Sequence, residues 1–386
     1  MPSRLLRTAL RLAVGASLLA SGALVAGYAV GPERWWPIAL AQYLPYPVLL
    51  LPPAAAVLLT GALGRGWRLA ALLGLVIVAT AVAGFELPAG ERTDGRLRVR
   101  LMTWNAKTHW ASLRPGGFEA LAAEIARYDP DIVVLQDAAD PVGIPPGAAG
   151  SVAALLGGRA RHAWGQFTIA SRWPVRDCGP AGIVPGASED AGMRCTVVIE
   201  GVAVLVYAVH LRTPRGGLMA ARHHALSGID GWEQNVAERL AQADSLAHAV
   251  SQANGPLIVA GDLNAPESSL VVRRLLNAGL RDAHSVAGFG FGHTYGHALR
   301  PGFSFLRLDH VLVGRGIGVA DCTVGTAELS DHRPVIADLL LTPGGPSAQA
   351  PRAGRRRRTG RPRSRGRSRG SAGPARARRR LRARPC

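Results

Sequence analysis

The sequence predicts an α/β domain that follows an N-terminal segment of apolar helices and precedes a basic tail. Three differences in composition support this division. Residues 1–90 are almost uncharged, residues 96–342 mix strand-like and helix-like runs, and residues 343–386 are rich in arginine. The 386 residues are enough for one large domain with such additional segments.

The first apolar stretch, Leu10 to Val30, is charged only at Arg11. It holds about 20 apolar or small residues, the length that crosses a bilayer as a helix. Arg4 and Arg7 precede it, so a cleaved signal peptide is the alternative interpretation. Two further apolar runs close behind favour an integral membrane anchor.

The second apolar stretch lies between Arg34 and Arg65, where 30 residues carry no charge. Aromatic residues gather near one end, as is typical of a membrane interface, and prolines are expected to kink the helix. The aromatic residues are Trp35, Trp36, Tyr43 and Tyr46, and the prolines are Pro45, Pro47, Pro52 and Pro53. Leu69 to Phe85 forms a third run near the lower length limit, so we expect three transmembrane helices in all.

The distribution of arginine predicts which side of the membrane holds the domain. Arg4, Arg7 and Arg11 precede the first span, and Arg65 and Arg68 lie between the second and third. Positively charged loops stay in the cytoplasm, so three crossings deliver the domain to the outer face. A group of arginines after the third span opposes this topology unless it belongs to the folded domain. These residues are Arg92, Arg96, Arg98 and Arg100.

The middle region begins with one strand, helix, strand unit. Leu97 to Trp104 alternates as a strand, Phe118 to Tyr128 has helical spacing, and Asp131 to Leu135 is a short apolar strand. Further strands are expected at Thr196–Ile199, Val202–Val209, Leu257–Ala260, Asp309–Val313 and Val335–Leu340, and further helices at Glu233–Ser251 and Leu270–Ala278.

Polar residues of one kind stand at the ends of these strands. They are Asn105, Gln136 and Asp137, His210, Asp262 and Asn264, and Asp331 and His332. Each one alone is an ordinary turn residue. Together they form an ordered set of carboxylates, amides and histidines at one rim of a sheet, which turn chemistry alone does not explain.

This set resembles the endonuclease/exonuclease/phosphatase superfamily over about 245 residues, the whole expected domain, with GDLN followed by SDHRP as the most specific pair. The matching pieces are TWN at 103–105, LQD at 135–137, SRWP at 171–174, HL at 210–211, GDLN at 261–264, RLDH at 307–310 and SDHRP at 330–334. The resemblance implies a four-layer α/β sandwich, in which two packed mixed β-sheets are flanked by helices. It also implies metal-dependent phosphoester hydrolysis.

The resemblance assigns a Mg²⁺ or Mn²⁺ ion to Asp137, with Asn105 nearby and Asp331 as a second or outer carboxylate. Asp137 stands where the family usually has glutamate. The shorter side chain leaves metal binding possible and the preferred metal open.

The same resemblance gives roles to five further residues. His332 contacts the phosphate and is oriented by Asp309, and His210 is a second acid/base group. Asp262 orients or deprotonates the attacking water, and the Asn264 amide binds a phosphate oxygen. Four residues that could border the site receive no role: His109, His293, His310 and Lys107.

The superfamily predicts the reaction better than the substrate. Membrane anchoring resembles the VanJ-type proteins associated with glycopeptide resistance, which implies a lipid-linked phosphate or pyrophosphate at the outer face of the membrane. The alternatives are a surface nuclease and a catalytically inactive binding or sensor module. An inactive module would be expected to lack a histidine or Asp262, and none is missing.

The formal net charge of +19 is local, because the last 36 residues hold 16 arginines and no acidic residue. This tail could bind nucleic acid non-specifically. It contains no aromatic residue for base stacking, so we favour a disordered extension that also contacts anionic lipid headgroups. The sequence leaves the oligomeric state open.

The four cysteines show no C-x-x-C spacing, which argues against a structural zinc site. Cys178 and Cys195 flank a Gly/Pro-rich segment between two strand-like runs. Two interpretations remain equal: a disulfide across a hairpin outside the cytoplasm, or two buried thiols.

Overall fold

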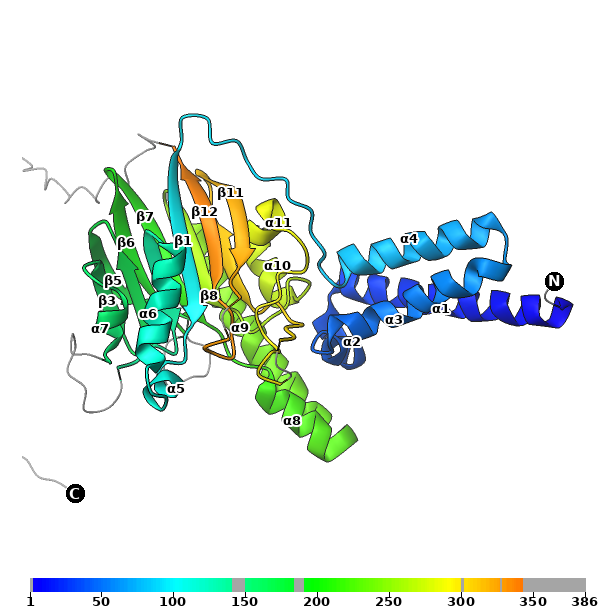
Figure 1. The fold of residues 1–386 in the computed structure, drawn as a ribbon. Helices are drawn as coiled ribbons and strands as arrows, with labels where there is room; N and C mark the ends of the chain where they lie inside the picture. Colours follow the sequence, from blue (N-terminus) through cyan, green and yellow to red (C-terminus); the bar gives the residue numbers. More distant parts are fainter. Residues whose placement is uncertain (1–2, 141–149, 184–190, 300–301, 327, 343–386) are drawn as a thin grey trace, which may run out of the picture. The chain divides into compact units, whose positions relative to one another are not determined.

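Two mixed β-sheets pack face to face in the region after the N-terminal helices (Figure 1). The computed structural model describes residues 3–140, 150–183, 191–299, 302–326 and 328–342. Each sheet has six strands, in the orders β11-β12-β1-β2-β4-β3 and β5-β6-β7-β8-β10-β9. Only β1 with β2 and β7 with β8 pair in parallel within the two sheets. The predicted pair of packed mixed sheets is therefore confirmed.

The strands are β1 Leu97–Asn105, β2 Ile132–Gln136, β3 Ala160–Trp164, β4 Phe167–Ser171, β5 Val175–Pro180, β6 Gly192–Ile199, β7 Val202–His210, β8 Leu257–Asp262, β9 Arg281–Asp282, β10 Asp309–Val313, β11 Ile317–Val324 and β12 Val335–Leu341. The helices between them are α5 Thr108–Ser112, α6 Gly117–Tyr128, α7 Val152–Leu155, α8 Arg215–His224, α9 Ile229–Gln252, α10 Leu270–Asn277 and α11 Ala283–Ala287.

Successive side chains along each strand point to opposite faces of its sheet, and the apolar ones form three layers. Val134 of β2, Val206 of β7 and Val311 of β10 belong to the central layer between the sheets. On the outer face of the first sheet, Leu121 of α6 belongs to a second layer. Leu246 of α9 belongs to the third, which covers the outer face of the other sheet. Helices thus flank both sheets and complete the sandwich.

The parallel strand pairs bring polar residues to one rim. Asn105 at the end of β1 lies opposite Gln136 at the end of β2. In the other sheet, His210 lies opposite Asp262, which in turn lies opposite Asp309 at the start of the antiparallel β10. Pairing register therefore determines which of the predicted strand-end residues are neighbours.

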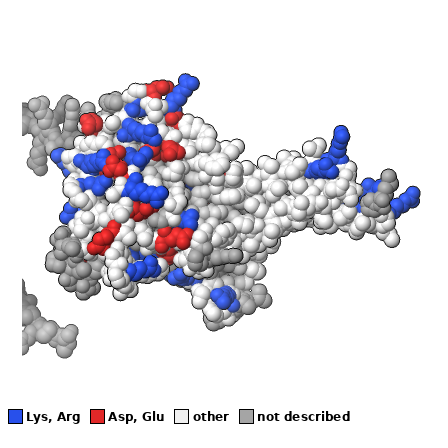
Figure 2. Space-filling model, viewed as in Figure 1, with Lys and Arg blue, Asp and Glu red and all other residues white. Residues whose placement is uncertain are grey.

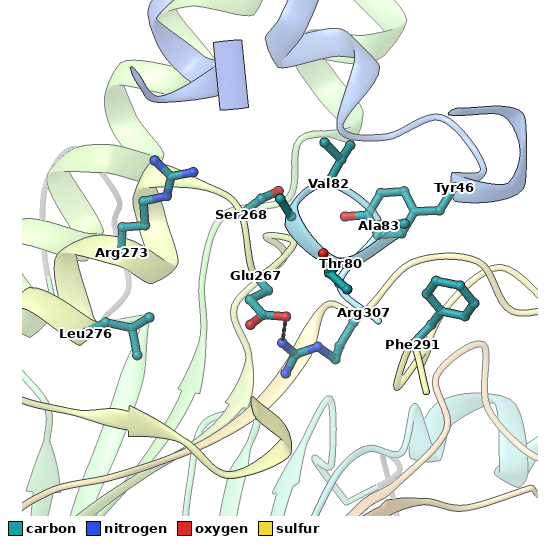
Figure 3. Close-up of a pocket in the computed structure, with 12 residues that line it drawn as sticks. Tyr46, Thr80, Val82, Ala83, Glu267, Ser268, Arg273, Leu276, Phe291 and Arg307 are labelled. Carbon is teal, nitrogen blue, oxygen red and sulfur yellow. Dashed lines mark hydrogen bonds and ion pairs between the residues drawn. The ribbon is translucent and has the colours of Figure 1, made fainter. Parts of the chain in front are cut away.

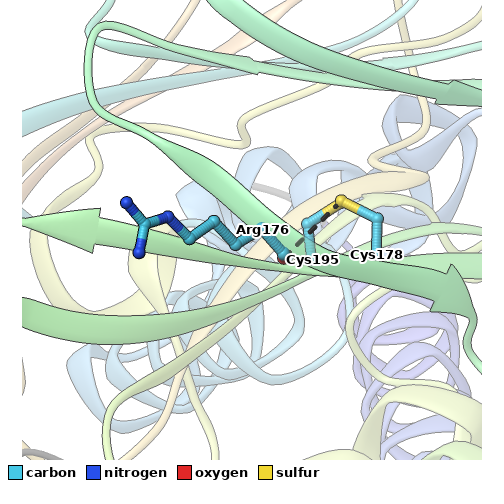
Figure 4. Close-up of a disulfide and its surroundings, with 3 residues drawn as sticks. All are labelled: Arg176, Cys178 and Cys195. Carbon is cyan, nitrogen blue, oxygen red and sulfur yellow. Dashed lines mark hydrogen bonds between the residues drawn. A yellow bond between two sulfur atoms is a disulfide. The ribbon is translucent and has the colours of Figure 1, made fainter.

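Cys178 and Cys195 are joined by a disulfide, which links the edge strand β5 to β6 (Figure 4). Cys195 is fully buried in the layer between the sheets, and Cys178 packs against that layer. Of the two interpretations left open by the sequence, the structure favours the disulfide. Cys322 is a free buried thiol.

The N-terminal segment forms four helices: α1 Arg4–Val30, α2 Trp36–Ala41, α3 Tyr46–Leu59 and α4 Arg65–Ala81. Among the described residues, only α1 is long and apolar enough to cross a membrane. The expected set of three transmembrane helices is therefore not found. Prolines divide the second segment, so that α3 has 14 residues, and α4 has 17. Both are shorter than the ~20 residues of a typical span.

Reciprocal helix capping joins these helices to the sandwich. The Glu33 carboxylate accepts hydrogen bonds from the Leu270 backbone N–H, at 2.9 Å, and from the Ser269 hydroxyl, at the N-terminus of α10. Arg273 of α10 donates to the carbonyls of Tyr28 and Ala29 at the C-terminus of α1. Each charge meets the helix end whose dipole it complements. The acidic residue and the arginine thus fix the two elements to each other.

The chain divides into two units, 1–348 and 349–386. The arginine-rich tail, predicted as disordered, lies outside the described residues.

Candidate active site

Asp262 lies at the centre of the strand-end residues. Its Oδ2 atom accepts a hydrogen bond from Asn105 Nδ2 at 3.1 Å, which joins the rims of the two sheets. The same oxygen lies 3.5 Å from His210 Nε2 and 3.6 Å from His332 Nε2. Asp262 is 1% exposed. One buried carboxylate oxygen therefore faces both histidines that the sequence singled out.

His332 and Asp309 form a buried pair. The Nδ1 atom of His332 lies 2.7 Å from Oδ2 of Asp309. Burial by itself disfavours the imidazolium, but the negative charges of Asp309 and Asp262 outweigh it and raise the pKa of His332 to about 9. The carboxylate thus orients the ring and favours its charged form.

Lys107, which the sequence left without a role, lies among the proposed metal ligands. Its ammonium is 2.7 Å from Asp137 and 4.0 Å from Asp331. Burial would raise the pKa of Asp137, but the neighbouring His210 and Lys107 lower it overall. Burial would likewise lower the pKa of Lys107, and Asp137 raises it overall. A cation between these two carboxylates suits the charge of the site.

The side chains also suit a hard divalent ion. Asn105 Oδ1 is buried and has no hydrogen-bond partner among the described residues, so its oxygen is free to act as a ligand. Together with Asp137 and Asp331 it makes an all-oxygen donor set, which Mg²⁺ and Mn²⁺ prefer. An ion there would have to displace or share space with the Lys107 ammonium.

A second possible cation site overlaps the histidine pair. Ligand atoms of Asp262, Asp309 and His332 all lie within 4.8 Å of one another. The Asp309–His332 hydrogen bond already accounts for part of this closeness. Because that bond occupies Nδ1 of the ring, we regard these three residues first as an acid/base group.

Backbone conformation is unusual at the site. Asn264, Asp137 and Lys107 all have positive φ angles, near 50°, 48° and 42°. Non-glycine residues adopt this left-handed region rarely, and such residues gather where function requires it. In GDLN, a Cβ at Gly261 would collide with the carbonyl of Val209, so only glycine fits there.

Asn264 holds the turn after β8. Its backbone N–H donates to Asp262 Oδ1 at 2.8 Å, and its Nδ2 donates to the Leu211 carbonyl at 2.9 Å. One N–H of the amide is thus already used within the protein. The second remains for the expected phosphate contact.

Several supporting residues escaped the sequence analysis. Trp104 Nε1 donates to the His332 carbonyl at 2.9 Å, and the Tyr295 ring lies 5.0 Å from the His332 ring. Gln166 Oε1 lies 2.7 Å from His210 Nδ1. Of these three residues only Trp104 lies in a quoted motif, TWN. Nothing local marks the other two.

His310 belongs to a separate buried network. Its Nδ1 lies 2.7 Å from Asp282, which also pairs with Arg307 at 2.8 Å, and Arg307 in turn pairs with Glu267. Arg307 and Glu267 border a cavity of about 280 Å³ next to the end of α4 (Figure 3). None of the eight predicted site residues lines this cavity. The RLDH motif therefore contributes Asp309 to the site and Arg307 and His310 to the fold.

His293 and His109 also remain outside the group around Asp262. The ring of His293 lies 5.6 Å from that of Tyr46, and His109 lies on the short helix α5 beside Trp110. The eight residues predicted for the site do gather at the one rim. They are Asn105, Asp137, His210, Asp262, Asn264, Asp309, Asp331 and His332.

The two-sheet sandwich and an Asp-His pair beside a carboxylate-rich rim define a hydrolytic type of site. Residues 102–332, more than half of the chain, match the model of the Endonuclease/Exonuclease/phosphatase family. The chain belongs to this family. Its members are hydrolytic phosphoesterases, nucleases or phosphatases, and generally use a divalent metal ion.

Three solved structures match part of the chain at low sequence identity. An endonuclease/exonuclease/phosphatase from Beutenbergia cavernae is 22% identical, with a TM-score of 0.46, over 64% of this chain and 72% of that one. Truncated TDP2 from Caenorhabditis elegans is 18% identical, with a TM-score of 0.48, over 64% and 99%. An AP endonuclease from Archaeoglobus fulgidus is 15% identical, with a TM-score of 0.44, over 62% and 98%.

Proposed function

We propose that this protein is a metal-dependent phosphoester hydrolase that acts at the outer face of the membrane on a lipid-linked phosphate or pyrophosphate. One contact carries the proposal. The Tyr43 hydroxyl, between the apolar helices α2 and α3, donates to the carbonyl of Asn264 at 3.4 Å. This contact joins the turn of Asn264 to the apolar N-terminal helices, which in this proposal are the membrane-anchoring segment. Lipid-linked substrates would reach a high effective concentration there.

The residues divide the work of hydrolysis. Asp262 accepts the proton of the attacking water as the new P–O bond forms. His332, charged through Asp309, donates to a phosphoryl oxygen and stabilises its negative charge. His210 protonates the leaving oxygen as the old P–O bond breaks, and Gln166 orients its ring.

A divalent ion held by Asn105, Asp137 and Asp331 would neutralise charge on the phosphoryl group. The Lys107 ammonium, which lies 2.7 Å from Asp137, would compete with this ion for the carboxylate. The Asn264 amide would hold a further phosphate oxygen.

The packing of the apolar helices supports a shared location in the bilayer. Val14 of α1, Ala56 of α3 and Ala71 of α4 form one buried cluster, and Tyr28 and Val78 belong to another nearer the sandwich. The side of the bundle seen in Figure 2 carries basic side chains only at its far end. This fits a cytoplasmic end that holds the arginines at the starts of α1 and α4, namely Arg4, Arg7, Arg11, Arg65 and Arg68. In this arrangement α3 and α4 pack beside α1, which is the helix among the described residues that is long enough to cross the membrane.

The disulfide supports an extracytoplasmic domain. Disulfides persist in oxidising compartments and are rare in the cytoplasm. The Cys178–Cys195 bond lies in the same sheet as His210 and Asp262, so the compartment of the bond is also that of the site.

A substrate panel tests the proposal. The full chain, purified in mild detergent, is incubated with Mg²⁺ or Mn²⁺ and with a polyprenyl pyrophosphate, sphingomyelin or plasmid DNA. We expect phosphate release from the polyprenyl pyrophosphate, and none from the His332→Ala variant.

Other outcomes separate the alternatives. Nicked or degraded DNA without phosphate release would favour a surface nuclease. Binding of a phosphorylated ligand without turnover of any substrate would favour an inactive sensor module and would overturn the proposed hydrolysis.

A further inference from the structure

Tyr43 connects the membrane-anchoring segment with the turn that carries Asn264. The carbonyl of Asn264 accepts two hydrogen bonds: 3.4 Å from the Tyr43 hydroxyl and 2.7 Å from Nη2 of Arg239 in α9. The guanidinium of Arg239 lies 5.6 Å from the centre of the Tyr43 ring, within cation–π range. Trp232 packs edge-on against the same ring at 5.9 Å.

Tyr43 also stabilises the buried charge of Arg239. Arg239 is 1% exposed, and its contacts within the described part of the chain are with the Asn264 carbonyl and the Tyr43 ring rather than with a carboxylate. A buried charge needs compensating contacts. Those that the structure provides are the carbonyl of Asn264 and the Tyr43 ring, so loss of the ring would loosen the arginine as well.

Asn264 connects the contacts with Tyr43 and Arg239 to Asp262 at the centre of the site. Asn264 is in the left-handed conformation, with φ near 50°, which external contacts must hold. Its N–H donates to Asp262 Oδ1 at 2.8 Å, and Asp262 Oδ2 faces Asn105, His210 and His332. An unbroken series of contacts therefore runs from Tyr43 to the carboxylate that we assign to the attacking water.

Tyr46 makes a second contact from the same short segment. Its ring lies 5.6 Å from that of His293, and Tyr295, two residues later, lies 5.0 Å from the ring of His332. Residues 43–46 thus contact the turn after β8 and the loop before β10, and Tyr295 of that loop lies against His332.

We propose that Tyr43 is a positioning residue: together with Arg239 it holds the Asn264 carbonyl, and thereby the Asp262 carboxylate, so that the segment joining two apolar helices forms part of the active site. This rests on the proposed hydrolytic function. It implies that the sandwich without its anchoring segment has a poorly ordered catalytic turn.

Two measurements on the full chain in detergent test the proposal. The first is kcat on bis(p-nitrophenyl) phosphate, a soluble phosphodiester that needs no lipid recognition. The second is hydrogen exchange, followed by mass spectrometry, of the peptide that contains residues 257–266. The variants are Tyr43→Phe, which removes only the hydroxyl, and Tyr43→Ala, which also removes the ring.

A matched control exists in the same bundle. The Tyr28 hydroxyl is buried and has no hydrogen-bond partner among the described residues, so Tyr28→Phe removes an equivalent group without touching Asn264. We expect Tyr28→Phe to leave both measurements unchanged. We expect kcat to fall by ~3- to 10-fold in Tyr43→Phe and by more than ~10-fold in Tyr43→Ala, with faster exchange at the turn in both.

The outcomes are distinguishable. Wild-type kcat and wild-type exchange in both Tyr43 variants would overturn the positioning role and leave the proposed function intact. Faster exchange in the variants, combined with no turnover by the wild-type chain of this or any other phosphoester, would support the structural link and overturn the proposed function. Because Tyr43→Phe keeps the ring packing, its result stands even if Tyr43→Ala fails to fold.

Discussion

Nδ1 of His332 lies 2.7 Å from Oδ2 of Asp309, with both side chains buried and Asp262 on the other side of the ring. The pair joins β10 to the loop before β12, which lie in different sheets. This cross-sheet contact turns two strand-end residues into one acid/base group.

We expect His332→Ala and Asp309→Asn each to lower kcat by ~100-fold or more, because both remove the oriented imidazolium. Asp262→Asn should have a similar effect. Steady-state kinetics on the best substrate of the panel provide the measurement. His162→Ala on the exposed strand β3 is the control and should retain normal kcat. Near-normal kcat in all three site variants would refute the assignment of the acid/base group.

Removal of metal should abolish turnover, because Asn105, Asp137 and Asp331 serve a phosphoryl group only through a bound cation. Excess EDTA is added, and Mg²⁺ or Mn²⁺ is then restored above the chelator concentration. Activity should disappear and return. Undiminished turnover in EDTA would exclude the metal mechanism.

Lys107→Met should tighten metal binding, since the substitution removes a cation that lies 2.7 Å from Asp137 and keeps an unbranched side chain that is one atom shorter. We expect the Mn²⁺ dissociation constant, measured by isothermal titration calorimetry, to fall by ~10-fold. Arg161→Met on the exposed strand β3 is a control for loss of one positive charge. An unchanged or weaker affinity would mean that Lys107 does not compete with the ion.

The membrane topology can be measured with reporter proteins fused after Leu341. Alkaline phosphatase forms its disulfides only outside the cytoplasm, so we expect an active phosphatase fusion. The green fluorescent protein fusion, exported by the general secretory route, should remain dark. The opposite pair of signals would place the site in the cytoplasm and remove the main support for an envelope-lipid substrate.

The folded protein should be less stable in mild acid because His284 is buried in its neutral form. His284 is 4% exposed, Gly288 and Gly292 pack against its ring, and burial lowers its pKa to about 4. Between this value and the unfolded value near 6.5, the unfolded chain binds the extra proton. The free energy of unfolding should therefore decrease as the pH falls from about 6.5 to about 4, with a contribution from this residue of roughly 3 kcal/mol at most.

Denaturant unfolding in detergent, measured across this pH range, provides the check. His284→Gln cannot titrate and should show a shallower decrease than the wild type. Parallel curves for the two proteins would show that His284 is not responsible.

The sequence alone predicted the strands that carry the site. β1, β2, β7 and β8 are apolar runs that end in polar residues, β10 begins with Asp309, and β12 follows Asp331 and His332. This local pattern predicts each of these strands to within two residues of its observed ends. Two of the strands that it missed, β3 and β5, lack such a pattern. β3 is exposed along its whole length, and β5 is interrupted by a register shift.

The membrane segment shows where a composition argument fails. Thirty uncharged residues between Arg34 and Arg65 satisfy the length of a span, but the helix divides around Pro45 and leaves α3 with 14 residues. The length of an uncharged stretch gives the number of residues available for a span. Prolines determine how many of these residues form one continuous helix.

By itself the sequence determined the family, the positions along the chain of the strands that bear the site, and the eight polar residues next to their ends. These features depend on short-range patterns and motifs. Only the tertiary structure decided which of those residues meet. The Asp309–His332 pair, the ammonium of Lys107 between two carboxylates, the Cys178–Cys195 bond and the contact of Tyr43 with Asn264 all join segments that no local periodicity relates. Burial of the apolar faces of the two sheets against each other brings both rims together, and pairing of β5 with β6 brings the two cysteines together.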